Sequence, residues 1–217
     1  PSPSLATLPI SLLIVGVSIA VLPANKLTSK LGRRLSLMIG LSIAIVGSLV
    51  SATAAYLLSF NLLAIGALTL GFSMAFVAQM RFCVIESVNH KEDSPKALSL
   101  LMVGGIFAAI LGPELAVAGK DWIASPHGFV GSFVGLACLL LLSILFVSRL
   151  KPTQLTTIEE EVPARKLTDI IRQPIFLVSL ASAAIGYGLM SYIMTATPLS
   201  MHVIDGHSLN ETKWVVQ

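Results

Sequence analysis

Ionisable side chains inside apolar runs are the residues of this chain best suited to moving a proton or holding an ion. Glu114 is the only acid well inside such a run, and proton relays through membranes use groups of this kind. Because Glu114 lies toward one end of its run, it is equally suited to touching lipid headgroups. Its role is therefore open between coupling and anchoring.

Three more polar residues close another apolar run: Gln79, Arg81 and Glu86. Arg81 is suited to binding an anionic group of a substrate or to steadying an acid that couples to protons. It also lies close enough to the end of the run for its aliphatic stem to reach water. Arg81 and Glu86 are five residues apart, so they do not face each other squarely on one helix.

A polar stripe occupies the last apolar run. Tyr187, Ser191 and Thr195 follow one another at intervals of four residues, which places them on one helix face. Such a stripe either lines a polar path or forms hydrogen bonds between helices.

Small residues also recur every four positions, in two different runs. One series is Gly104, Ala108 and Gly112, followed by Pro113, and the other is Gly16, Ala20 and Ala24. Small side chains on one helix face allow two helix backbones to approach closely. We interpret both series as helix-packing faces.

The composition identifies the class of protein. Of 217 residues, 55% are hydrophobic and only 12% are charged, whereas a soluble domain carries about 25% charged residues. Cys83 and Cys138 lie inside apolar runs, without the spacing of a metal site or a disulfide. The sequence has no His-Glu-x-x-His pattern and no P-loop, and aromatic residues are not interleaved with its bases. We expect a membrane protein that is not an enzyme, uses no cofactor or metal and binds no nucleic acid.

The elements that position these residues are apolar runs, each long enough to cross a bilayer, which takes about 20 residues. Six such spans are predicted, at 5–24, 35–58, 62–80, 97–118, 129–147 and 175–198, with a turn at the polar break 59–61. They must be helices, because hydrocarbon offers no partner to an unpaired backbone amide. The predicted fold is an all-α polytopic helix bundle.

Basic residues orient these spans. Alternate loops and their edges hold twelve of the fourteen lysines and arginines, and the opposite side holds only Lys120 and Lys213. Such an excess marks the cytoplasmic side. We therefore expect a multi-pass protein of the cell membrane, with both ends of this chain outside. A helix upstream of residue 1 is also expected, because the amino-terminal residues are a poor signal peptide.

One cytoplasmic turn, NKLTSKLGRRLSL, carries Lys26, Lys30, Arg33 and Arg34 and no acid. A cytoplasmic anchor is sufficient to explain these charges. The turn also resembles the signature between the second and third helices of the major facilitator superfamily. Lys30, Gly32, Arg33 and Arg34 match that signature. The chain departs from it at Asn25, Ser29 and Ser36, where the family has a glycine, an aspartate and a base.

The resemblance implies that the chain corresponds to helices two to seven of twelve. Residues 1–150 would be most of the amino-terminal bundle, 151–173 a cytoplasmic linker with a short helix at 167–172, and 174–217 the start of the carboxy-terminal bundle. Lys30, Gly32, Arg33 and Arg34 would close a cytoplasmic gate, and the helix of Tyr187 would line the central cavity. Gly112 and Pro113 resemble part of the family's antiporter motif, although the glycines that follow the proline in that motif are absent and packing explains these residues better.

The function implied by the resemblance is secondary active transport of a small solute. Two helix bundles would alternate access to a site between them, with coupling to a proton or another ion. The alternative is a polytopic membrane protein without transport activity, such as a sensor or an assembly scaffold.

Overall fold

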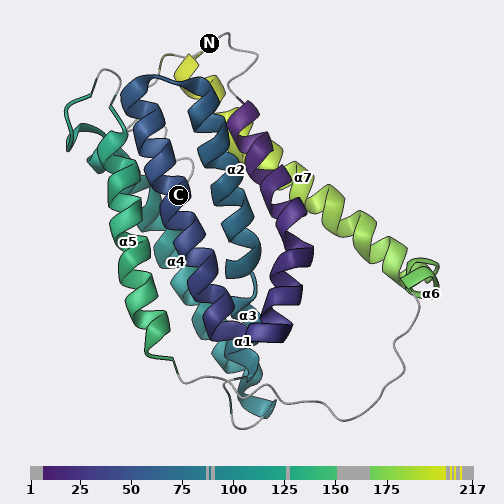
Figure 1. Cartoon of the computed structure of the whole chain (residues 1–217). Helices are drawn as coiled ribbons and strands as arrows, with labels where there is room; N and C mark the ends of the chain where they lie inside the picture. The colour runs from purple at the N-terminus through teal and green to yellow at the C-terminus, as the bar shows by residue number, and fades with distance from the viewer. Residues whose placement is uncertain are drawn as a thin grey trace. The chain divides into compact units, whose positions relative to one another are not determined.

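The structure is a computed structural model that describes residues 7–86, 88, 91–125, 128–150, 167–203, 206, 208 and 211. The chain divides into two compact units, 1–155 and 156–217, and each is described by itself. All the regular structure in the described residues is helical, which confirms the predicted fold class (Figure 1).

Helix α1 (Leu8–Leu57) contains two spans joined at one residue. Its 50 residues would measure about 75 Å if straight, far more than the roughly 30 Å of a bilayer core. Gly32 leaves helical geometry, with φ 80° and ψ 163°, and the chain reverses direction there (Figure 1). We call residues 8–31 the first arm and residues 33–57 the second arm. The expected loop at 25–34 is wrong in extent, because the backbone stays helical up to Gly32.

The first arm packs on α2 (Phe60–Val77) through its small residues. Gly16, Ala20 and Ala24 are buried, and a Cβ atom on Gly16 would lie 2.9 Å from the Phe72 amide nitrogen. The two helix backbones are thus in contact, which confirms that this series is a packing face.

The turn between the second arm and α2 consists of Leu58 and Ser59, so it overlaps the predicted turn 59–61 only at Ser59. Leu58 adopts a left-handed conformation, with φ 54°. The Ser59 hydroxyl then caps α2 by accepting a hydrogen bond from the Leu62 amide, at 3.4 Å.

The second arm lies between α2 and α5 (Val130–Ser148). A Cβ atom on Gly47 would lie 3.0 Å from the Leu70 amide nitrogen, so the second arm and α2 are also in close contact. On the other side, the Ser48 hydroxyl donates a hydrogen bond of 2.6 Å to the Phe133 carbonyl of α5. The second arm therefore packs against α2 on one side and α5 on the other.

The remaining elements of this unit are α3 (Met80–Glu86), η2 (Lys91–Asp93), α4 (Ser94–Ala118) and η3 (Gly119–Asp121). Close packing holds η3 against α5, since a Cβ atom on Gly119 would lie 2.8 Å from the Ser132 Cα. Helix α4, in contrast, has no buried residue.

The second unit contains α6 (Leu167–Ile171) and α7 (Pro174–Val203). The short helix expected at 167–172 is confirmed, and Pro174 begins α7 as predicted. Most of the predicted linker 151–173 lies outside the described residues. Within the described chain, five helices are long and apolar enough to cross a membrane, and the first of them comprises the two arms of α1.

Candidate inner gate

Gly32 is the geometric centre of the basic turn. Its φ of 80° and ψ of 163° fall in a region that is essentially restricted to glycine. A Cβ atom there would meet no described atom within 4 Å. The backbone conformation, rather than lack of space, therefore requires glycine at this position.

Arg33, directly after the break, holds the segment that follows α2. Its Nη1 donates a hydrogen bond to Gln79 Oε1 at 3.4 Å, and Gln79 Nε2 donates to Asn25 Oδ1 of the first arm. The Arg33 guanidinium also lies 5.4 Å from the centroid of the Phe82 ring on α3, within cation–π range. Gln79 therefore ties together residues on both sides of the Gly32 break.

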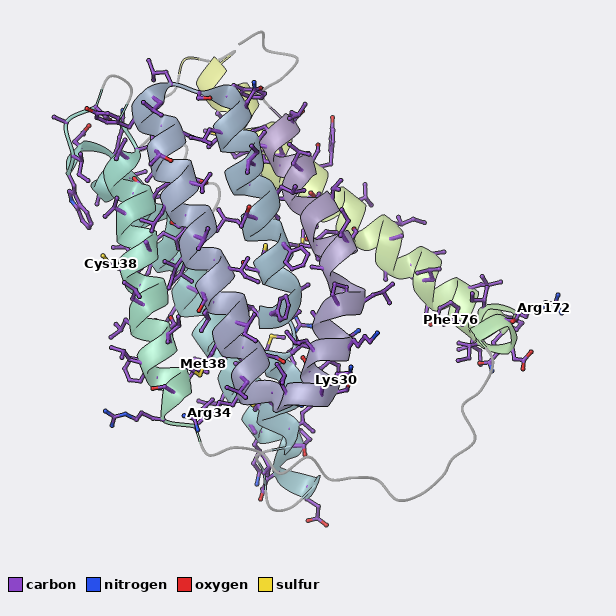
Figure 2. All side chains as sticks on the ribbon, in the orientation of Figure 1. Lys30, Arg34, Met38, Cys138, Arg172 and Phe176 are labelled. Atoms are coloured by element: carbon purple, nitrogen blue, oxygen red, sulfur yellow. The ribbon has the colours of Figure 1, made fainter. Side chains whose placement is uncertain are left out.

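Arg34 contacts a different helix, α5. Its Nη2 donates a hydrogen bond to the Ser148 carbonyl at the carboxy terminus of α5, near which it is drawn in Figure 2. An arginine at this end of a helix satisfies a free carbonyl and complements the helix dipole. Further along the second arm, Leu37 and Leu41 form a buried apolar cluster with Val147 of α5. The two arginines thus fasten the turn to the segment between α2 and α3, to α3 and to α5, all within the same unit.

The lysines of the turn behave differently. Lys26 and Lys30 are exposed and stand four residues apart, on one face of the first arm. They continue the exposed apolar face that includes Ile19 and Leu22. The basic turn therefore combines a pair of packed arginines with a pair of exposed lysines.

The structure brings only some of the candidate residues together. Gln79 accepts a hydrogen bond from Arg33 of the turn, whereas Arg81 is exposed on α3. The side chain of Glu86 lies outside what the structure describes. Glu114 is half-buried on α4, and Tyr187 and Ser191 belong to α7 in the second unit.

Four contacts around the turn were not predicted from the sequence: those of Arg33 to Gln79 and to Phe82, that of Arg34 to the Ser148 carbonyl, and that of Gln79 to Asn25. Asn25 carried a signal, because it replaces the first glycine of the resembled signature. Phe82 and the Ser148 carbonyl carried no such signal. Nothing in a sequence distinguishes a phenylalanine that contacts a distant arginine from any other, and every residue has a backbone carbonyl.

Unlike the small-residue series on the first arm, the series on α4 packs against no other described helix. A Cβ atom on Gly104 or on Gly112 would meet no described atom within 4 Å, and Ala108 is exposed. The packing role of these residues and of Pro113 therefore remains a prediction.

Comparison with known proteins identifies the family. The family model of the Major Facilitator Superfamily matches residues 1–210. The chain belongs to the Major Facilitator Superfamily. The resemblance noted in the basic turn is thus confirmed over nearly the whole chain. A multi-pass membrane protein follows from this membership and from the apolar helices.

Two curated proteins are similar to the chain. The "Riboflavin transporter RfnT" of Brucella anthropi is 34% identical over 217 residues, which are 99% of this chain and 54% of the relative. The "Uncharacterized MFS-type transporter YfiU" of Bacillus subtilis is 29% identical over 189 residues, which are 87% of this chain and 34% of the relative. The chain thus spans about half the length, or less, of these relatives. No solved structure gives a significant match.

Proposed function

We propose that this chain is part of a secondary transporter, not an enzyme, which carries a small organic solute across the cell membrane. The observation that supports this most strongly is the 34% identity with a riboflavin transporter over 99% of the chain. Riboflavin, or a solute of similar size and aromatic character, is accordingly the first substrate to test. In this proposal both ends of the chain face outward.

The packing of the first unit suits an alternating-access mechanism. In such transporters one helix bundle rocks against another around a fixed site, and each bundle must move as one body. Backbone contacts at Gly16 and Gly47 fasten both arms to α2, and the Ser48 bond adds α5. We propose that residues 1–150 move as one bundle and that 174–217 begin the other, with the linker between them.

The inner turn is proposed to act as the cytoplasmic gate. Gly32 sets the reversal, and Arg33 and Arg34 fix the segment that follows α2 and the inner end of α5 through hydrogen bonds. Lys30 remains exposed and available to the opposite bundle or to lipid headgroups. Closing and opening would then shift these parts of the bundle together rather than one at a time.

Residues that would bind the solute or couple its transport to an ion are proposed from the chemistry of their side chains. Glu114 and Arg81 are suited to coupling transport to a proton or another ion, and Gln79 and Glu86 flank Arg81 in the sequence. Tyr187 and Ser191 offer hydroxyl groups on one face of α7. Thr195 is already engaged, since its hydroxyl donates a 2.8 Å hydrogen bond to the Ser191 carbonyl.

The test is uptake by the full-length protein that contains this chain. The protein would be produced in bacteria that neither synthesise nor import riboflavin, and uptake of radiolabelled riboflavin would be compared with that of cells carrying an empty vector. Arg33→Ala should reduce uptake, while Lys120→Ala, a basic residue on the opposite side, should not. A protein that reaches the membrane but imports neither riboflavin nor any solute of a wider panel would favour a sensor or scaffold instead.

A further inference from the structure

The exposed side of the first arm changes character along its length. Val15, Ile19, Leu22, Lys26 and Lys30 follow one another at intervals of three or four residues, which places them on one helix face. All five side chains are exposed, and the exposed fractions of Ile19 and Leu22 reach 58% and 78%. We call these five residues the lysine face. It is apolar from residue 15 to residue 22 and cationic from residue 26 to residue 30, within the basic turn, where Figure 2 shows Lys30.

The apolar part of the lysine face has the side chains of a surface that contacts lipid. On another side of the same arm, Gly16, Ala20 and Ala24 are buried against α2, because small residues let two helix backbones approach closely. The lysine face has the branched side chains of Val15 and Ile19 instead. Acyl chains fill the spaces between such side chains, whereas a helix backbone is held away by them. The two faces of this arm are therefore suited to different partners, a helix and a lipid.

The length of the apolar part matches one leaflet of a bilayer. Val15 and Lys26 are eleven residues apart, or about 16 Å along a helix. One leaflet contributes half of a hydrocarbon core of about 30 Å, or roughly 15 Å. When Val15 lies at the level of the acyl-chain ends, Lys26 therefore lies at the level of the headgroups, and Lys30 follows about one turn beyond.

A phosphate group complements the cationic end of the lysine face. The first arm contains no aspartate or glutamate. Within the described residues, no acid pairs with the ammonium group of Lys26 or Lys30, whereas Arg33 and Arg34 donate hydrogen bonds inside the unit. Basic side chains at the end of a membrane span attract anionic phospholipid headgroups. A zwitterionic headgroup is attracted less, because its own cation offsets the phosphate.

We infer that the lysine face binds one anionic phospholipid, with its phosphate between Lys26 and Lys30 and its acyl chains along Val15, Ile19 and Leu22. The lipid belongs to the inner leaflet in the proposed orientation, and only this choice of leaflet rests on the proposed function. Because Lys30 lies beside the reversal in α1, a bound lipid stabilises the folded protein at that point.

Thermal unfolding of the purified full-length protein in detergent tests the inference. Phosphatidylglycerol, which is anionic, and phosphatidylcholine, which is zwitterionic, would be added in turn with identical acyl chains. The test variant is Lys26→Gln/Lys30→Gln, which removes two charges at exposed positions. Arg149→Gln/Arg172→Gln removes the same charge from two other exposed positions and is the control. Lys26→Arg/Lys30→Arg keeps the charge of the lysine face.

We expect phosphatidylglycerol to raise the unfolding midpoint of the parent by several degrees more than phosphatidylcholine does. Most of this difference should disappear in Lys26→Gln/Lys30→Gln and remain in the control and in the arginine variant. Equal shifts by the two lipids in the parent would overturn the inference, and so would a test variant that keeps the difference. An equal loss in the control would assign the effect to overall charge and overturn it too. The readout needs no transport, so its failure is distinct from that of the transport proposal.

Discussion

Gly16 and Phe72 bring the first arm and α2 into backbone contact: a Cβ atom on Gly16 would lie 2.9 Å from the Phe72 amide nitrogen, and closer still to the Leu68 carbonyl oxygen. Neither of these atoms belongs to a flexible side chain. This contact between the first arm and α2 therefore cannot accommodate a methyl group at position 16 unless one of the two helices moves.

Gly16→Ala should destabilise the protein by about 1–3 kcal/mol, the usual cost of overpacking. The measurement is the thermal unfolding midpoint of the purified full-length protein, by scanning fluorimetry. Val21→Ile adds one carbon to the same arm at an exposed position and should leave the midpoint unchanged. Equal midpoints for both variants would mean that the first arm and α2 are not in backbone contact at Gly16.

Gly32→Val should abolish transport while leaving insertion intact. A β-branched residue at φ 80° and ψ 163° is strained by about 1–3 kcal/mol, and relief of that strain would rotate Arg33 and Arg34 away from their partners. Lys26→Ala removes one of several redundant inside charges and should behave like the parent. Uptake would be measured at matched membrane abundance. If both variants transport normally, the turn is an anchor and not a gate.

Gln79→Leu should destabilise the protein by about 1–3 kcal/mol, because Arg33 loses an acceptor in a partly buried site and Asn25 loses a donor. Scanning fluorimetry should show a lower unfolding midpoint than for the parent. Gln173→Leu, a change of the same chemistry at an exposed residue, serves as the control. A double variant with Arg33→Ala should be less destabilised than the sum of the two single changes; strict additivity would show that the two residues do not interact.

The proposed orientation predicts opposite labelling of two aspartates. In a background without cysteines, a cysteine at Asp121 should react with an impermeant thiol reagent added to intact cells. A cysteine at Asp93 should react only after the cells are opened, because it lies on the side rich in basic residues. The reverse pattern would invert the topology and place the basic turn outside.

The spans and their turns were predictable from the sequence because bilayer thickness and hydrogen-bond satisfaction leave few alternatives. The turn at Ser59 and the short helix before Pro174 followed from local residue types. The helical continuation to Gly32 was missed, since polar residues between two apolar runs are typical of a loop. Contacts such as Arg33 to Gln79, 46 residues apart, depend on the packing of helices and leave no local pattern in the sequence.

The single-residue reversal at Gly32 has a consequence for how this chain can evolve. An ordinary surface loop tolerates insertions, because its ends are free to adjust. Here the backbone is helical up to one residue on either side, so an inserted or deleted residue would rotate an entire arm by about 100°. Gly16 or Gly47 would then leave its contact with α2, and a larger side chain would take its place. We therefore expect functional homologues to vary in the charges of this turn but to keep the number of residues between Gly16 and Gly47.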